Sequence, residues 1–363
     1  MSGINENLLM SVSISLLYDG MVVLDDIYDS TGDRLLVTSG NVLNDTQIER
    51  IKRLNSGSPY IYVTGRTHKS MVSKRPDTEI ESLIDIEEST GYAETKNETF
   101  RLLEKAASSE TINIDSLRTV ADDLSNHIVT TPPAVIVTLI NAMAPVDEYL
   151  QRHSINVSLL NGLIGRWMGM SETDVDRLIL IGLLHDCGKT LLPSKILNAP
   201  RKLTVSEYEV VKKHAELTYD LMEDFPVPIR LAASCHHERA NGTGYPNKLK
   251  NEHIMIEARI TAVSDIYDAM VAQRSFRGSQ SPFCALATLS RMSLNELDKE
   301  VVRVFKENIP EILLDKPVMM SDGVIAVVRK LHNEDLEYPT VEMGGKMLKC
   351  NEELYPVSMF NDE

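Results

Sequence analysis

The 363-residue sequence is poor in cysteine and in aromatic residues. Its four cysteines, Cys187, Cys235, Cys284 and Cys350, show no CxxC spacing, which argues against both a zinc ribbon and a disulfide framework. No apolar run approaches the roughly 20 residues that a membrane-spanning helix needs. Residues 1–6 also lack the basic stretch that opens a signal peptide. We therefore expect a cytoplasmic protein with reduced thiols.

Positive charge is scarce at both ends of the chain. The net charge is −9 over residues 1–140 and −6 over residues 311–363, whereas residues 141–310 are almost neutral at −1. A protein that binds a long nucleic acid needs a basic stripe, so the acidic flanks argue against such a partner. The near-neutral middle can hold a small anionic ligand if metals and a few cations converge there, although the same distribution also fits a purely solubilising role.

Length and composition indicate a globular protein of two or three domains. Hydrophobic residues make up 43% of the chain and charged residues 25%. Residues 8–64 contain short strand-like runs at 16–18, 21–24, 35–37 and 60–63, with turns such as Asp19-Gly20 between them. A short helix over 47–54 is expected, with Asn44 or Asp45 as its cap. The polar stretch 65–96 is typical of a linker.

Helical periodicity dominates the rest of the chain up to residue 308. Pro132-Pro133 precedes an apolar helix over 134–143. Capping patterns at Ser171 and Thr204 begin two further helices, of which the second is expected to carry His214. A helix that opens at Pro228 is expected to reach His236-His237. Strand-like segments come last, at residues 318–320, 324–328 and 340–342, with a turn over 321–323.

An apolar run over residues 178–184 leads directly into His185-Asp186, which we expect to lie in a buried helix. Burying an imidazole beside a carboxylate without further partners costs free energy, so the pair needs a reason to be buried. A metal ion is the commonest reason. The alternative is a core histidine that simply forms a hydrogen bond with Asp186.

Further potential metal ligands accompany Asp186. They are His153, His185, His214, His236, His237 and Asp265. Imidazole nitrogens and carboxylate oxygens suit iron, manganese or zinc at a catalytic site. Seven ligands exceed the needs of one tetrahedral ion, so the pattern predicts a two-metal site in which Asp186 bridges. Paired ions are suited to phosphate-ester hydrolysis because they clamp the attacking and the leaving oxygens.

These residues, together with Gly188-Lys189, the run His236–Arg239 and Gly244-Tyr245-Pro246, resemble the HD-GYP family over about residues 110–310. The members of this family are bacterial phosphodiesterases of the HD superfamily that hydrolyse cyclic di-GMP. The resemblance implies a mainly α fold: a helical HD-type metal-dependent hydrolase domain with a small α+β N-terminal module and a short β-rich C-terminal tail. The expected divisions are 1–64 for the module, 65–110 for the linker and connecting helix, 111–308 for the HD-GYP domain and 309–363 for the tail.

The resemblance also implies roles for individual residues. The metal ligands would be His153, His185, Asp186, His214, His236, His237 and Asp265. Asp186 and Lys189 would be catalytic, with the lysine offsetting charge on the phosphoryl oxygens. Substrate would be bound by Lys189, by Tyr245 stacking on a guanine, and by Arg274 and Arg277 gripping phosphates. The alternatives are an ordinary buried loop ring for Tyr245 and a solvated helix end for the two arginines.

The function implied is hydrolysis of cyclic di-GMP to 5′-pGpG, and onward to GMP, by in-line attack of a metal-held hydroxide. One alternative is a hydrolase of another cyclic dinucleotide such as cyclic GMP-AMP. Another is a non-catalytic cyclic di-GMP receptor, which Asn241 favours because the family often has Asp at this position. Besides the dinucleotide, the expected partners are a second copy of the chain or a signalling partner that binds the N-terminal module.

Residue 149 decides the expected number of metals. HD-GYP sites come in two-metal and three-metal versions, and the latter has an additional Glu one helical turn before the first histidine. That position is Tyr149 here, four residues before His153 and on the same helix face. The adjacent Glu148 is turned away by about 100°. The resemblance therefore implies two divalent ions, iron or manganese.

Overall fold

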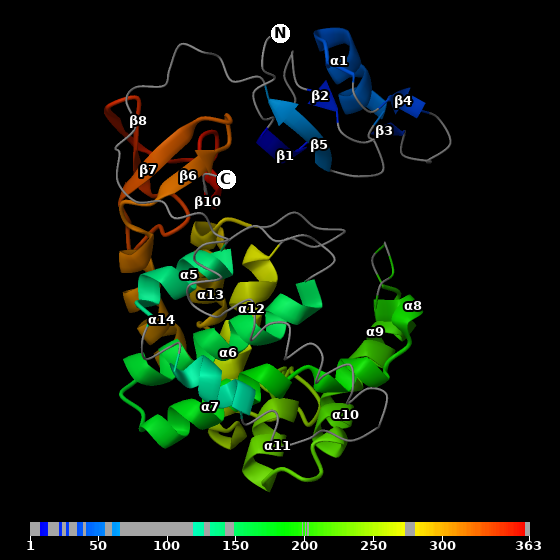
Figure 1. Cartoon of the computed structure of the whole chain (residues 1–363), viewed down its shortest axis with the longest axis vertical. Coiled ribbons are helices and arrows are strands. Elements are labelled where there is room, and N and C mark those ends of the chain that lie inside the picture. Colours follow the sequence, from blue (N-terminus) through cyan, green and yellow to red (C-terminus); the bar gives the residue numbers. More distant parts are fainter. Residues whose placement is uncertain are drawn as a thin grey trace. The chain divides into compact units, whose positions relative to one another are not determined.

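A computed structural model of the chain forms two compact units, residues 1–79 and 80–363 (Figure 1). The finer domain bounds within them stay predictions. The structure describes residues 8–13, 22–23, 27–28, 35–38, 41–54, 60–65, 119–126, 131–141, 149–197, 199, 201, 203–272 and 280–359.

The N-terminal unit is a small α+β module, as predicted. Its three-stranded antiparallel sheet has the order β1-β5-β2, and a separate ribbon pairs β3 with β4. The bounds are β1 Leu8–Ser13, β2 Val22–Val23, β3 Ile27–Tyr28, β4 Leu35–Val37, α1 Asp45–Leu54 and β5 Tyr60–Gly65. Asn44 caps α1, since its side chain accepts a hydrogen bond from the Gln47 backbone N–H at 2.9 Å. Strands β1 and β3 were not predicted, and the strand-like run at 16–18 lies outside the described residues.

The second unit is mainly helical and confirms the predicted fold class. Its described helices include α5 Pro133–Asn141, α6 Tyr149–Trp167, α7 Glu172–Leu184, η3 Cys187–Leu191, α8 Ser194–Leu197, α9 Val205–Lys212, α10 His214–Leu221, α11 Val227–Ser234, η4 Asn251–His253, α12 Ile256–Val271, α13 Pro282–Met292 and α14 Lys299–Leu313. Helices α6, α7 and α12 pack against one another. A Cβ atom added at Gly182 of α7 would lie 2.7 Å from the Ser158 Cα atom of α6, so glycine permits this close packing.

A five-stranded antiparallel sheet completes this unit. Its order is β10-β6-β7-β8-β9, with β6 Pro317–Met320, β7 Ile325–Lys330, β8 Thr340–Met343, β9 Lys346–Lys349 and β10 Pro356–Met359. The C-terminal pattern predicted three of these strands, β6, β7 and β8, but not β9 and β10. The turn between β6 and β7 contains Gly323 at φ +80°. Val318, Ala326 and Val341 of the sheet belong to the same buried core cluster as the helices.

Several helices end earlier than the periodicity predicted. Helix α7 ends at Leu184, so His185 and Asp186 lie in the turn before η3 and not inside a buried helix. Helix α9 ends at Lys212 and His214 begins α10. Helix α11 ends at Ser234, two residues before His236. The predicted ligands therefore lie largely at helix ends, where the chain can turn several side chains towards one point.

The capping residues were predicted correctly. The Ser171 side chain accepts a hydrogen bond from the Asp174 backbone N–H, and Thr204 forms a complete capping box with Glu207.

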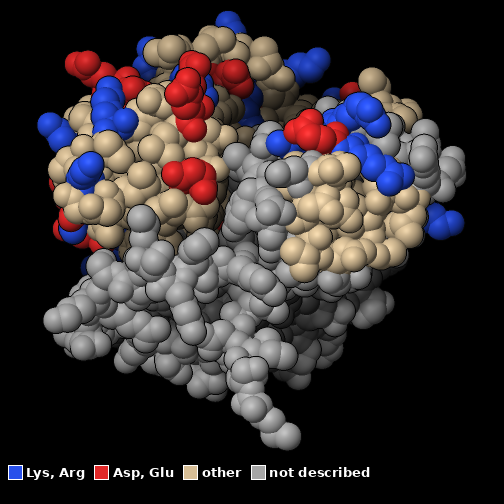
Figure 2. Space-filling model, turned by 90° about the horizontal axis from the view of Figure 1, so that it is seen from above, with Lys and Arg blue, Asp and Glu red and all other residues tan. Residues whose placement is uncertain are grey.

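Among the described helices, none is both long and apolar enough to cross a membrane. On the face seen in Figure 2, acidic and basic side chains lie interspersed over the described surface.

Candidate metal centre

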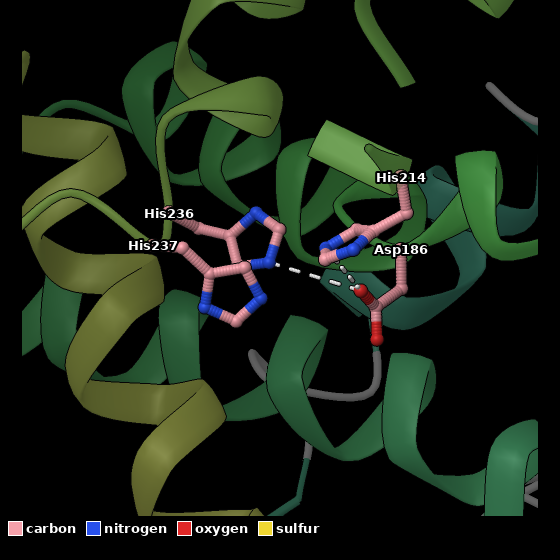
Figure 3. Close-up of side chains that lie close together, drawn as sticks. All are labelled: Asp186, His214, His236 and His237. Carbon is pink, nitrogen blue, oxygen red and sulfur yellow. Dashed lines mark ion pairs between the residues drawn. The ribbon is translucent and has the colours of Figure 1, made fainter. Parts of the chain in front are cut away.

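The seven predicted ligand side chains converge inside the helical unit. Helix α6 carries His153, and the turn after α7 carries His185 and Asp186. The remaining four come from the start of α10, the segment after α11 and the middle of α12. They form two groups, one of Asp186, His214, His236 and His237 (Figure 3) and one of His153, His185 and Asp265. Within each group the ligand atoms lie within 4.8 Å of one another.

Asp186 lies between the two groups. Its Oδ1 atom is 3.4 Å from His214 Nε2 and 3.7 Å from His236 Nε2. Its Oδ2 atom is 3.3 Å from His185 Nε2 and 3.5 Å from His153 Nε2. The two oxygens of one carboxylate thus face different sets of histidines, an arrangement that allows the carboxylate to bridge two cations.

Three of the converging atoms are buried and have no hydrogen-bond partner among the described residues. They are Asp186 Oδ1, His214 Nε2 and His236 Nε2. Buried polar atoms without partners are rare in folded proteins because they lose their hydrogen bonds to water. These three are all lone-pair donors directed at one region, which is the arrangement that a metal ion requires. The residues present therefore fit a metal centre.

Backbone carbonyls orient three of the histidines. His185 Nδ1 lies 2.7 Å from the Gly182 oxygen, His214 Nδ1 lies 2.6 Å from the Val211 oxygen, and His236 Nδ1 lies 2.7 Å from the Ala233 oxygen. A carbonyl oxygen can only accept, so Nδ1 is the protonated nitrogen in each ring. The Nε2 lone pair is consequently directed into the site, as metal ligation requires.

His153 is oriented by a carboxylate that the sequence reasoning missed. Its Nδ1 atom lies 2.7 Å from Asp268 Oδ2, and Asn156 Nδ2 donates to Asp268 Oδ1 at 2.7 Å. Asp268 is fully buried. It follows Asp265 by three residues on α12, so the Asp-x-x-Asp spacing on one helix face could have identified it.

Burial and neighbouring charges shift the pKa values of the site towards the protonation states in which these side chains can bind a metal. Burial lowers the pKa of His214, and it lowers the pKa of His236 and His237 well below the usual value. For Asp186, burial alone would raise the pKa, but the Lys189 ammonium and the surrounding histidines hold it well below its usual range. The imidazoles of His214, His236 and His237 are therefore neutral and the Asp186 carboxylate is ionised at neutral pH.

Lys189 and Gly188 connect the site to η3. Lys189 Nζ forms an ion pair with Asp186 Oδ2. The Gly188 backbone N–H donates to Thr218 Oγ1 of α10 at 3.0 Å. A Cβ atom at residue 188 would lie only 2.2 Å from the His214 backbone oxygen, so glycine is required for η3 to approach α10.

Tyr245 covers one side of the centre. Its ring centroid lies 4.6 Å from that of His237, at an interplanar angle of 31°. The loop that carries it is held by Glu238, a second residue that the sequence reasoning missed. The Glu238 carboxylate is buried and accepts from the backbone N–H groups of Asn247 at 2.6 Å and Leu249 at 2.9 Å.

Asn241 holds the turn of the loop, although it lacks the negative charge that an aspartate would have at this position. Its Oδ1 atom accepts from the Thr243 backbone N–H at 3.0 Å and from the Thr243 hydroxyl at 2.6 Å. An aspartate would offer the same acceptor, so the substitution preserves these hydrogen bonds.

Of the other predicted residues, Arg274 and Arg277 lie outside the described residues. Helix α6 begins at Tyr149, whose side chain is likewise outside the description.

The site lies within a segment that matches a known family. Residues 137–301 match the HD domain family. Over 227 residues the chain is 31% identical to a cyclic di-GMP phosphodiesterase of Pseudomonas aeruginosa, covering 62% of this chain and 54% of the relative. Over 206 residues it is 31% identical to 3′3′-cGAMP-specific phosphodiesterase 3 of Vibrio cholerae, covering 52% of this chain and 44% of the relative. The chain thus spans about half the length of the curated relatives it matches.

A solved structure shares the fold. An HDG"Y"P protein from Bdellovibrio bacteriovorus superposes with a TM-score of 0.51 at 15% identity, covering 84% of this chain and 100% of the other. At this identity the likeness concerns the fold alone.

Proposed function

We propose that this chain, whose residues 137–301 match the HD domain family, is a metal-dependent phosphodiesterase of the HD-GYP type that hydrolyses cyclic di-GMP. The single observation that carries this proposal is the division of the Asp186 carboxylate between the two ligand groups. A bridging carboxylate between clustered histidines suits paired ions, and paired ions suit the hydrolysis of phosphodiesters.

Two ions would be held by the seven converging side chains, with Asp186 shared between them. His153, His185 and Asp265 would complete one position, and His214, His236 and His237 the other. When bound, the ions would supply Lewis-acid stabilisation of the phosphate and a nucleophilic water at neutral pH. The mixed nitrogen and oxygen ligands favour iron or manganese.

The protein's own side chains would position and stabilise the substrate. The Lys189 ammonium, which is paired with Asp186, lies where it can offset charge that develops on the phosphoryl oxygens. Tyr245 offers a ring face beside His237 for stacking on a guanine. Arg274 and Arg277 are proposed to grip phosphate through their guanidinium groups. The first product would be 5′-pGpG, and a second cleavage would give GMP.

Cyclic GMP-AMP is the second candidate substrate. It is favoured by the similarity to relatives of Vibrio cholerae named as 3′3′-cGAMP-specific phosphodiesterases. A receptor without activity is less well supported, because all seven side chains that are proposed to hold metal converge and the Asn241 turn is formed.

The test is to incubate the metal-loaded protein with each dinucleotide and to separate the products by chromatography. We expect 5′-pGpG from cyclic di-GMP, at a higher kcat/KM than for cyclic GMP-AMP. Elemental analysis of protein prepared without oxygen should give two ions per chain. Tight binding of cyclic di-GMP without any product would identify a receptor instead, and three ions would contradict the proposed count.

We place this reaction in the cytoplasm, where the four free cysteines of the chain would stay reduced. The N-terminal α+β module is proposed to act as the contact for a second copy of the chain or for a signalling partner. Size-exclusion chromatography with light scattering, on the full chain and on residues 80–363, would test the first of these.

A further inference from the structure

A second lysine lies next to the candidate metal centre, on the helix that immediately precedes His214. Lys212 Nζ, in the last turn of α9, lies 5.8 Å from the ring centroid of Tyr245 and 5.6 Å from that of Tyr208. The Tyr245 ring also lies beside two predicted ligands, His237 at 4.6 Å and His214 at 6.2 Å between ring centroids. Tyr245 therefore lies beside both Lys212 and the predicted ligands, and Lys212 lies at the rim of the same site.

Both α9 side chains are accessible to a ligand. Tyr208 is 49% exposed and the Lys212 side chain 28% exposed. The ion-pair partner of Lys212 is Glu209, at 2.7 Å and 60% exposed. An exposed pair of this kind contributes little free energy, so Lys212 can exchange Glu209 for an anionic ligand.

Helix α9 is held firmly enough to present these side chains. The Glu207 carboxylate forms the capping box with Thr204. It also accepts hydrogen bonds from Arg201 Nη2 at 2.7 Å and from Arg201 Nη1 at 2.8 Å. The hydrogen bonds from Arg201 and Thr204 lower the pKa of Glu207 to about 2, so the clamp persists through the neutral range. Tyr208 follows this clamp directly.

The charges and rings match a ligand with two phosphates and flat bases. Lys189 pairs with Asp186 and is proposed to act at the reacting phosphate, whereas Lys212 lies beside the rings of Tyr245 and Tyr208. A cyclic dinucleotide carries two phosphodiesters, and only one of them can be at the metal centre during cleavage. We propose, resting on the function proposed above, that Lys212 binds the phosphodiester that is not cleaved and that the exposed Tyr208 ring stacks on a nucleobase. Stacking on an exposed ring and a charge-assisted contact to phosphate are both known means of binding nucleotides.

Steady-state kinetics on two substrates test this inference. Lys212→Ala should raise KM for cyclic di-GMP about tenfold, as expected for one lost charge-assisted hydrogen bond, with kcat changed less than about twofold. Hydrolysis of bis(p-nitrophenyl) phosphate, which has one phosphodiester and no nucleobase, should be unchanged. Tyr208→Ala should raise KM for cyclic di-GMP to a similar degree, and Tyr208→Phe should restore it because the ring face is retained.

Lys213→Ala is the matched control, since it removes an exposed positive charge from the adjacent position. If Lys212→Ala behaves like Lys213→Ala, the inference is wrong. It is also wrong if Lys212→Ala loses bis(p-nitrophenyl) phosphate hydrolysis and bound metal together, because the lysine would then support only the centre. A parent protein that hydrolyses bis(p-nitrophenyl) phosphate but neither binds nor cleaves any cyclic dinucleotide would overturn the proposed function, and this inference with it.

Discussion

At the scale of single residues, protonation and orientation determine what the site can bind. The three histidines that donate Nδ1–H to carbonyl oxygens present only their Nε2 lone pairs to the interior. Asp186 is ionised and uses both oxygens, one for each ligand group. Asp265 also faces both groups, with Oδ1 3.3 Å from His153 Nε2 and Oδ2 3.8 Å from His237 Nδ1. Asp186 faces two histidines with each of its oxygens, so both proposed ions depend on it.

Replacing Asp186 with Ala should abolish hydrolysis and lower the bound metal, because both ions lose a shared ligand. Elemental analysis and product chromatography of the same preparation measure the two effects. Asp220→Asn, an exposed carboxylate on α10, is the control and should retain both properties. Near-native activity and full metal content in Asp186→Ala would contradict the two-metal assignment.

Asp268 acts on the metal only through His153, as a positioning residue. His153 and Asn156 contact different oxygens of Asp268, and Asp268→Asn replaces one of these oxygens with an NH₂ group, so one of the two donors loses its acceptor. Metal affinity should fall roughly 10- to 100-fold, as is usual when the outer partner of a ligating histidine is lost. Excess Mn²⁺ should restore much of the activity. Titration in metal-chelator buffers measures the affinity, and an unchanged value would show that Asp268 only fills space.

At the scale of elements, the site depends on how turns and short helices are held against one another. The loop after His237 is held by the Glu238 carboxylate, which takes two backbone N–H groups. The η3 segment is held against α10 through Gly188 and Thr218. Neither contact involves a predicted metal ligand, yet each determines where a ligand or the Tyr245 ring lies.

Glu238→Gln should loosen the Tyr245 loop without emptying the metal centre. A glutamine amide presents one oxygen and one NH₂ group, so one of the two loop N–H donors loses its acceptor, at a cost of about 1–3 kcal/mol. We expect a lower Tm and a raised KM for cyclic di-GMP, with metal content retained. The control Glu252→Gln changes an exposed carboxylate and should do neither. A normal KM together with a normal Tm would show that Glu238 does not hold the loop.

Gly188→Ala should be more disruptive than its size suggests. The new methyl group would meet the His214 backbone oxygen at 2.2 Å, so η3 or α10 must move and displace a predicted ligand. Urea unfolding should show a loss of about 1–3 kcal/mol in the free energy of unfolding, and metal content should fall. Gly165→Ala meets the Leu178 side chain at 2.7 Å, which can change rotamer, and should be milder. Equal effects would contradict this account.

At the scale of the whole molecule, the buried carboxylate of Asp298 connects η4 and α12 to α14, the helix that precedes the C-terminal sheet. Asp298 Oδ2 accepts from Arg259 Nη1 at 2.6 Å and from Asn251 Nδ2 at 3.2 Å. Its Oδ1 accepts from the Glu300 and Val301 backbone N–H groups and so caps α14. Burial alone would raise the pKa of Asp298, but these hydrogen bonds, that from Arg259 foremost, lower it.

This lowered pKa predicts a pH-dependent contribution to stability. The folded state favours the ionised carboxylate, so its contribution is fully present above the ordinary aspartate pKa of about 3.9 and is lost as the pH falls through the lower folded value. Asp298→Asn should therefore reduce the free energy of unfolding at pH 7, and the difference from the parent should shrink below about pH 4. Urea unfolding of the metal-free proteins at several pH values measures this. A difference that is constant with pH would mean that only the cap geometry matters.

Much of the site and of the fold was predictable because the signals are local. The chemical type of each ligand, the caps at Ser171 and Thr204, and the change from helical to strand-like periodicity near residue 317 all depend on short stretches of sequence. The helix ends were less predictable. Apolar periodicity continues through Leu184, but η3 begins after Asp186 because Gly188 packs against α10, a contact between distant residues.

The sequence by itself determined which side chains are able to bind metal, since donor chemistry is a property of the residue. Only the tertiary structure decided that these side chains meet, which oxygen of Asp186 faces which histidines, and that Asp268, Glu238 and Lys212 lie around them. These relations arise from the packing of α6, α7, α10 and α12, and packing minimises exposed apolar surface over the whole unit, not over any one segment. No local sequence pattern determines how these helices pack.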